Sequence, residues 1–344
     1  MLRLTALPLA LLCACTAPAE TREVQPDGRY SAVGVLDADQ RNFIVIGGDG
    51  PRGVVDDVLS FSLQSRRWTQ RTPWPETTVR GTAVRHGEDI WVFGGSTRGW
   101  GELATLHRFG PNTDDSPETL PAREPWPAAR YKHAAVLAGD TMWVLGGKNN
   151  DGDEPVIHSD LWAWDVRERS WHLQPTDEGP GGIYRQGMVH DAARDVLWIH
   201  GGYDQEEQRR DWLWKLDLQT ARWERVTWEG EGPGRRASHT LAMLDRGPAA
   251  PEGDGVLLWG GHDHDVELWL FDIEARRWRV LPNAGPASPT ARDAQVAEIT
   301  ADGRELLVLC GDVLDGSPSG PVCDAWKFEF EISSWQRLAN TLVP

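Results

Sequence analysis

Six arginines that recur about every fifty residues are the side chains in this sequence best suited to binding chemistry. They are Arg29, Arg80, Arg130, Arg185, Arg236 and Arg292. A guanidinium group is planar and permanently charged, and it can donate two parallel hydrogen bonds to one carboxylate. Brought together at one place, these arginines would form a pocket for an anion such as an acidic sugar.

Four tryptophans accompany these arginines. Trp74, Trp126 and Trp228 each lie a few residues before an arginine, and Trp100 follows a pair of glycines. An indole ring offers a large apolar face on which a ligand can stack. We therefore predict one ligand-binding face lined by the six arginines and these four tryptophans. The alternative for the tryptophans is that they only cover the rim of this face.

A second interpretation makes the arginines structural. Acidic residues recur with a similar period, at Asp57, Asp160, Glu267 and Asp324, with Asp211 one position out of register. If each arginine pairs with one of these acids, the charge of the arginine is largely neutralised. The arginines would then hold the fold together and bind no ligand, and the sequence leaves both interpretations open.

Other patterns in the chain are weaker as sites. The run 262–265 (His-Asp-His-Asp) could bind a metal, but structural metal sites use four ligands at a recognisable spacing. The acidic run 149–154 lacks the ligand spacing of a calcium loop. The sequence has no nucleophile elbow, phosphate-binding loop or dinucleotide fingerprint. We predict no metal, no cofactor and no catalytic residue.

The elements that must position these side chains belong to a repeat. A branched or aromatic run ends in two glycines at Gly47-Gly48, Gly94-Gly95, Gly146-Gly147, Gly201-Gly202 and Gly260-Gly261, and a sixth copy ends in Cys310-Gly311. An alternating, aromatic strand and a turn follow. A lone tryptophan then closes five of the copies: Trp68, Trp171, Trp223, Trp278 and Trp335. The second copy lacks this tryptophan, so its last strand is doubtful.

This combination of glycine pair, aromatic strand and terminal tryptophan resembles the kelch repeat, from about Arg29 to Leu338. The resemblance implies an all-β fold: a six-bladed β-propeller whose blades are four-stranded and antiparallel. A single blade cannot bury both of its faces, so the blades must close into a ring. The 19 tryptophans, against 4 tyrosines and 7 phenylalanines, would supply much of the packing between blades.

The strand order of such a blade places the arginines. The first strand begins near each arginine, and the second strand returns to the same face and ends at the glycine pair. All six arginines should therefore form a ring at the mouth of the central channel. His133 and His239, three residues after Arg130 and Arg236, are predicted to pack inside the blades.

The N-terminus is typical of a secretory signal. A basic start is followed by a short apolar run that is too short to span a bilayer. The run ends Leu12-Cys13-Ala14-Cys15, which resembles a bacterial lipoprotein signal and implies that Cys15 is lipidated. The alternative is a plain signal peptide. We predict a signal at 1–14, a lipid-anchored linker at 15–28, a propeller at 29–338, a C-terminal tail at 339–344, and location at the bacterial outer membrane.

That interpretation leaves two cysteines, Cys310 and Cys323, in an oxidising compartment where disulfides persist. We predict that they are bonded to each other, with two free thiols as the alternative. They would flank one loop of the sixth repeat.

Composition narrows the function. The net charge of −17 argues against binding to nucleic acid, which needs a basic footprint. We predict a monomeric, lipid-anchored module that binds a protein or a glycan at the cell envelope. The alternative is an enzyme that resembles the sialic-acid mutarotases, which are also six-bladed. An oxidase of the galactose-oxidase type would need a copper site with a cross-linked Tyr-Cys pair. It is rejected, because both remaining cysteines are better placed to pair with each other than with a tyrosine.

Overall fold

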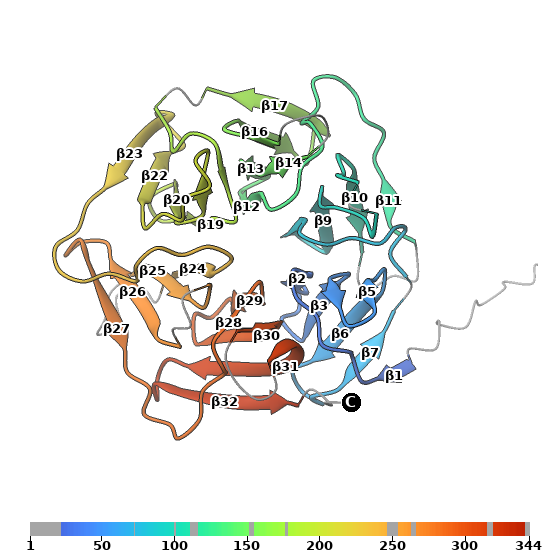
Figure 1. Cartoon of the computed structure of the whole chain (residues 1–344), viewed down its shortest axis with the longest axis vertical. Helices are drawn as coiled ribbons and strands as arrows, with labels where there is room; N and C mark the ends of the chain where they lie inside the picture. Colours follow the sequence, from blue (N-terminus) through green and yellow to red (C-terminus); the bar gives the residue numbers. More distant parts are fainter. Residues whose placement is uncertain are drawn as a thin grey trace, which may run out of the picture.

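The computed structural model describes residues 22–71, 73–99, 101–110, 116–150, 155–175, 178–245, 254–262, 266–314 and 319–340. In these ranges the chain forms strands and turns and no helix, so no helix there could cross a bilayer. Six sheets stand around a central channel like the blades of a propeller (Figure 1). The predicted fold, a six-bladed propeller of four-stranded antiparallel blades, is confirmed.

Each blade adds its strands from the channel outwards, in chain order. The innermost strands are β2 (Val33–Leu36), β8 (Thr82–His86), β12 (Ala134–Ala138), β19 (Gly187–Asp191), β24 (Thr240–Leu244) and β29 (Val296–Ile299). The second strands are β3 (Asn42–Ile46), β9 (Asp89–Phe93), β13 (Thr141–Leu145), β20 (Val196–His200), β25 (Gly255–Trp259) and β30 (Glu305–Val313). Each innermost strand contacts that of the next blade, and β29 contacts β2, which closes the ring.

The two outer strands of each blade follow. The third strands are β6 (Val58–Ser62), β10 (Leu106–Phe109), β16 (Leu161–Asp165), β22 (Leu213–Asp217), β26 (Leu268–Asp272) and β31 (Gly320–Glu329). The outermost are β7 (Trp68–Gln70), β11 (Glu118–Thr119), β17 (Ser170–Gln174), β23 (Arg222–Val226), β27 (Arg277–Leu281) and β32 (Ser334–Ala339). The doubtful last strand of the second repeat is the two-residue β11.

Short antiparallel β-ladders lie on the face where the second strands end. They pair β4 (Asp49–Gly50) with β5 (Gly53–Val54), β14 (Lys148–Asn149) with β15 (Val156–Ile157), β18 (Ile183–Tyr184) with β21 (Tyr203–Asp204), and β28 (Arg292–Asp293) with β30. We call this face, which carries the loops from each second strand to the third, the upper face.

The first described residues add a strand where a linker was predicted. β1 (Arg22–Val24) pairs antiparallel with β7 and gives the first blade a fifth strand at its outer edge (Figure 1). Arg22 lies opposite Gln70, at the end of β7 nearer the upper face. The signal at 1–14, Cys15 and the tail from 341 lie outside the described residues.

Six hydrophobic clusters hold the ring together, one at each junction between neighbouring blades. The tryptophan of the outermost strand reaches into the preceding blade. The Trp171 ring lies 5.0 Å from Phe93, and the Trp335 ring lies 5.5 Å from Trp259. Each such ring buries on the order of 150–250 Å² of surface. The predicted role of these tryptophans in packing between blades is therefore confirmed.

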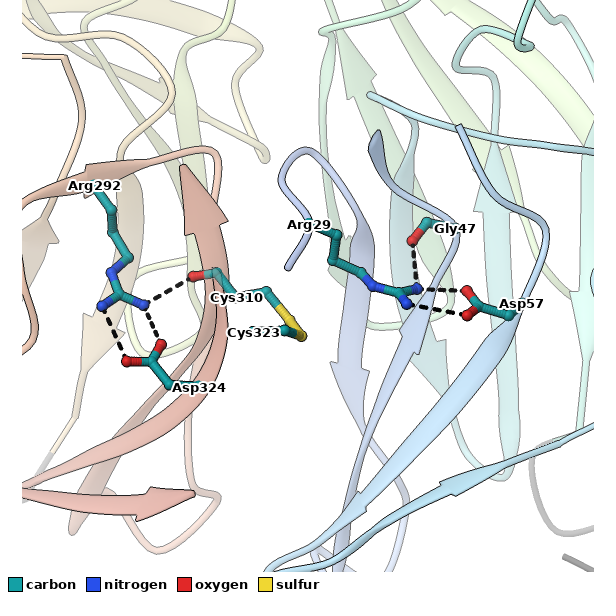
Figure 2. The surroundings of a disulfide bond; sticks show 7 residues. All are labelled: Arg29, Gly47, Asp57, Arg292, Cys310, Cys323 and Asp324. Atoms are coloured by element: carbon teal, nitrogen blue, oxygen red, sulfur yellow. Dashed lines mark hydrogen bonds and ion pairs between the residues drawn. A yellow bond between two sulfur atoms is a disulfide. The ribbon is translucent and has the colours of Figure 1, made fainter. Parts of the chain in front are cut away.

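The cluster between the last and first blades joins Trp68 to Leu307 and Leu309, so packing closes the ring. In the same seam Cys310 and Cys323 form a disulfide (Figure 2). The predicted bond is thus present in the structure. Cys310 takes the place of the first glycine of a pair and has a positive φ of 56°, as those glycines do.

Candidate functional site

A ring of backbone hydrogen bonds gives the blades a common register. The second glycine of each pair donates to a carbonyl of the next blade over 2.7–2.9 Å: Gly48 to Thr78, Gly95 to Arg130, Gly147 to Ile183, Gly202 to Arg236, Gly261 to Arg292 and Gly311 to Arg29. The first glycine must lack a side chain here, since a Cβ on Gly47 would lie 2.2 Å from the Thr78 oxygen. Arg29, Thr78, Arg130, Ile183, Arg236 and Arg292 are therefore equivalent positions.

The four arginines at this position are buried and structural. The guanidinium of Arg130, with 0% exposure, donates Nη1 to Asp160 Oδ1 over 2.6 Å and Nη2 to Asp160 Oδ2 over 2.9 Å. Nη1 also donates to the carbonyl of Gly146 over 3.0 Å. Burial alone would raise the pKa of Asp160, but the hydrogen bonds and charge of Arg130 hold that pKa below its usual value.

The same clamp recurs at the closing seam. Arg29 forms a bidentate pair with Asp57, and Arg292 forms one with Asp324 (Figure 2). Arg292 also donates to the carbonyl of Cys310 over 3.2 Å. Arg236 donates to the carbonyls of Gly260 and Pro233 and is 2% exposed. The structural interpretation is confirmed for Arg29, Arg130 and Arg292, whose predicted acids are their partners.

Arg80 and Arg185 occupy a different position, two residues further along the chain. They belong to a second closed ring, in which the backbone N–H of one blade donates to the carbonyl of the preceding blade over 2.8–2.9 Å. Its members, all with φ between 49° and 62°, are Ser31, Arg80, Lys132, Arg185, Ser238 and Ala294. The prediction that six arginines form a single ring is therefore wrong: two line the channel and four lie inside the blades.

We call this second ring the channel mouth. Its residues line a cavity of about 280 Å³ that continues between the innermost strands. Three consecutive members, Arg80, Lys132 and Arg185, are cations on the second, third and fourth blades, and we call them the cationic arc. The other three members are small. The positive charge of the mouth is thus confined to one side.

In the described part of the chain, Lys132 and Arg185 have no carboxylate within ion-pair distance, whereas the guanidinium of Arg185 contacts Nε2 of His262 at 3.0 Å. Burial, and then the charges of Arg185, Arg80 and Lys148, lower the pKa of Lys132 to about 7 against a smaller opposite effect of Glu207. Such a site favours an incoming anion.

All four tyrosines of the chain lie beside the arc. The Lys132 ammonium lies 4.8 Å from the ring of Tyr131 and 5.6 Å from that of Tyr184. Tyr184 stacks on Tyr203 at 5.2 Å. Burial, followed by a hydrogen bond to Asp49, raises the pKa of Tyr30, which the charge of Arg80 partly offsets. These rings give the mouth apolar faces together with hydroxyl groups.

The far side of the mouth carries acids. Asp293 contacts Nε2 of His262 at 2.9 Å, and Asp49 accepts from the Tyr30 hydroxyl at 2.9 Å. Burial raises the pKa of Asp312, as do the neighbouring charges of Asp293 and Asp49. The channel mouth is therefore cationic beside the second to fourth blades and carries carboxylates where the sixth blade meets the first.

The tryptophans do not lie where the prediction placed them. Trp74 is 2% exposed and packs on His107 and Phe109 between the first and second blades. Trp126 packs on Trp164 and Trp171 in the next seam, and Trp228 packs on Trp278 between the fourth and fifth blades. All three pack between blades, and none of them lines the channel mouth. Trp126 and Trp228 instead line cavities of about 310 and 380 Å³ away from the mouth. Trp100 lies outside the described residues.

His133 and His239 pack inside the blades, as predicted. His133 and His239 are buried; burial first, and then neighbouring charges, lower the pKa of each, so both are neutral at pH 7. His133 shares a 2.7 Å hydrogen bond with Thr82 of the preceding blade. No group of three or more metal-binding side chains comes together in the described ranges. Residues 151–154 and 263–265 lie outside them.

Sequence reasoning missed Lys132 and the register of Arg80 and Arg185. A signal for that register was present. The residue three places after Arg130, Arg236 and Arg292 is His133, His239 or Gln295, although after Arg29 it is Ala32, and the counterpart in the fourth blade is Gln186. Gln186 and Gln295 both donate to the carbonyl of the last strand residue before a glycine pair. This spacing identifies Ile183, and not Arg185, as the equivalent of Arg130.

Comparisons with known proteins agree with this architecture. A model of the KLHDC2/KLHL20/DRC7 Kelch-repeats domain matches residues 13–176 and 132–247. The leucine-zipper-like transcriptional regulator 1 homolog of Drosophila melanogaster is 28% identical over 258 residues, 69% of this chain and 25% of the relative. Kelch domain-containing protein 3 of Mus musculus is 25% identical over 297 residues, 79% of this chain and 73% of the relative.

Kelch domain-containing protein 10 of Xenopus tropicalis is similar over a shorter stretch. It is 30% identical over 199 residues, which is 54% of this chain and 47% of the relative. The chain therefore spans a quarter of the fly protein, about half of the frog protein and about three quarters of the mouse protein.

Proposed function

The chain belongs to the kelch-repeat family, and we propose that it is a binding module that holds an anionic group of a protein or glycan at its channel mouth. Kelch propellers are commonly protein-interaction modules. The observation that carries the proposal is the cationic arc. Arg80, Lys132 and Arg185 line one side of a cavity, and Lys132 and Arg185 lack carboxylate partners within the described residues.

A carboxylate suits this site better than a neutral group does. Guanidinium groups bind carboxylates bidentately, and a partly desolvated site strengthens that attraction. With a net charge of −17, most of the surface repels an anion, so a focused cluster of cations would direct it to the mouth. The tyrosine rings beside the arc would contact the apolar part of the ligand.

The test compares two arginine variants of the full chain against a panel of acidic peptides and anionic sugars, by calorimetry. Arg185→Gln should weaken binding at least about tenfold, since a hydrogen bond to a charged group contributes about 1.5–3 kcal/mol. The control is Arg304→Gln, whose side chain is 77% exposed at a turn far from the mouth. Equal affinity for both variants, with melting temperatures unchanged, would refute the site.

We also propose that Cys15 carries a lipid that tethers the propeller to the bacterial outer membrane. The support is the Leu12–Cys15 motif and the position of β1, whose first residue lies near the upper face. Six residues separate Cys15 from Arg22, which limits the distance between the two residues to at most about 25 Å. The channel mouth would thus face ligands at the membrane or in the adjoining envelope polymer.

Fractionation of cells that express the protein tests the tether. The wild-type chain should sediment with the outer membrane, and Cys15→Ser should move it to the soluble fraction. Cys13→Ser serves as the matched control and should leave the protein in the membrane. Membrane association of Cys15→Ser would contradict the proposal.

A further inference from the structure

Lysine is rare in this chain. Only four of its 35 basic residues are lysines, namely Lys132, Lys148, Lys215 and Lys327. Three of the four contact carboxylates: Lys148 with Glu207 at 2.7 Å, Lys215 with Glu224 at 2.9 Å, and Lys327 with Glu305 and Glu329 at 2.7 Å. Lys132 alone has no such partner among the described residues, although it lines the cavity of the mouth.

The neighbours of Lys132 disfavour its charged form. Its backbone hydrogen-bonds to Arg80 on one side and to Arg185 on the other, each over 2.8 Å, so both cations flank it in the ring. Burial, together with these charges and that of Lys148, brings the pKa of Lys132 to about 7. The neutral amine of Lys132 is therefore accessible near pH 7. A neutral lysine amine is a nucleophile, whereas both arginines stay charged.

We propose that Lys132 forms an imine with a small 2-oxo carboxylate whose carboxylate group is held by Arg80 or Arg185. The proposal deepens the proposed function, because it rests on anion binding at the mouth. The ring places a carboxylate-binding cation on the blade to either side of Lys132, and the charges of both arginines act on its amine. A ligand held by either one would present a carbonyl carbon adjacent to its carboxylate, next to the Lys132 nitrogen. The cavity of about 280 Å³ suits a small molecule.

The covalent step balances without a further reactant. The nitrogen of Lys132 attacks the carbonyl carbon and forms a C–N bond, which gives a carbinolamine after proton transfer from nitrogen to oxygen. The carbinolamine loses its oxygen as water to form the C=N bond. Amine and ketone therefore yield imine and water, and nothing is oxidised or reduced. The Tyr131 and Tyr184 rings near the nitrogen would limit access of water to the imine.

Reductive trapping tests this proposal on the full chain. The protein is incubated with pyruvate and cyanoborohydride at pH 7, and the modified fraction of each lysine is measured by peptide mass spectrometry. Lys132 should be modified at least about tenfold faster than the other three lysines, whose ammonium groups contact carboxylates. Lys132→Arg should leave only the slow background. Arg185→Gln should slow trapping by pyruvate much more than trapping by acetaldehyde, which has no carboxylate and is slowed only because loss of the Arg185 charge raises the pKa of Lys132.

The outcomes separate the imine from the underlying anion site. Equal modification of all four lysines would overturn the proposal, and so would trapping by pyruvate that does not depend on Arg185 and Arg80. If pyruvate binds by calorimetry and no adduct forms, the imine is refuted and the anion site stands. If pyruvate neither binds nor reacts, while acidic peptides or sugars bind through Arg185, this ligand class is wrong and the proposed function survives.

Discussion

Arg130→Ala tests the structural arginines, and it should destabilise the propeller strongly. The substitution removes both hydrogen bonds to Asp160 and leaves the carbonyl of Gly146 without this donor. Asp160, whose side chain is 29% exposed, would keep its charge next to the seam with the Trp162 indole as a donor but no cationic partner. Loss of one member of a buried ion pair costs about 3–5 kcal/mol, and the partial exposure of Asp160 favours the lower end.

The assay is thermal and urea unfolding of the purified chain. A loss of about 3 kcal/mol should lower the melting temperature by several degrees in a protein of this size. Arg185→Ala is the matched control: Arg185 contacts His262 and no described carboxylate, so we expect a change below about 1 kcal/mol. The double variant Arg130→Met with Asp160→Leu should recover part of the loss, because no charge stays behind.

The unfolding pH profile adds a second readout. The pKa of Asp160 is lowered in the folded protein, so its ion pair contributes stability above the pKa of the unfolded chain, and that contribution disappears as the pH falls through the folded value. The gap between wild type and Arg130→Ala should therefore narrow in acid. If Arg130→Ala melts at the wild-type temperature, or if Arg185→Ala destabilises the protein equally, then Arg130 is not the structural arginine and Arg185 not the channel-lining one.

Three further predictions concern the channel and its closure. Affinity for a carboxylate without a carbonyl group should rise by up to about tenfold from pH 8 to pH 6, as Lys132 protonates, and Lys132→Gln should abolish this dependence in calorimetry. Burial raises the pKa of Glu298, which accepts from the Leu36 N–H, to about 7 from 4.5, so its stabilising contribution is lost as the pH rises through 7. The melting temperature of Glu298→Gln should accordingly equal that of the wild type at pH 4.5 and exceed it at pH 8. A difference in melting temperature that does not change with pH would contradict this. Replacing Cys310 and Cys323 together by serine should cost about 3 kcal/mol in urea unfolding, and alkylation of two thiols in the unreduced, secreted wild type would refute the bond.

The repeated glycine pairs and tryptophans determined the architecture from sequence alone. Both act through local constraints that recur in every blade: a positive φ with no room for a Cβ at Gly47, and a large ring at Trp171 that must be buried against the preceding blade. The acids expected to pair with Arg29, Arg130 and Arg292 were also visible, because arginine and acid recur with the same period.

Only the tertiary structure decided which arginines face the channel. Turns between the first two strands differ in length among the blades, so the spacing from Arg185 to Gly201 equals that from Arg130 to Gly146, although the two arginines are not equivalent. A shift of two residues moves a guanidinium from a buried clamp to the mouth. The cationic arc itself joins Arg80, Lys132 and Arg185 from three blades, and no local pattern brings them together. The ring brings them together, because the backbone of each blade hydrogen-bonds to that of the next at these positions.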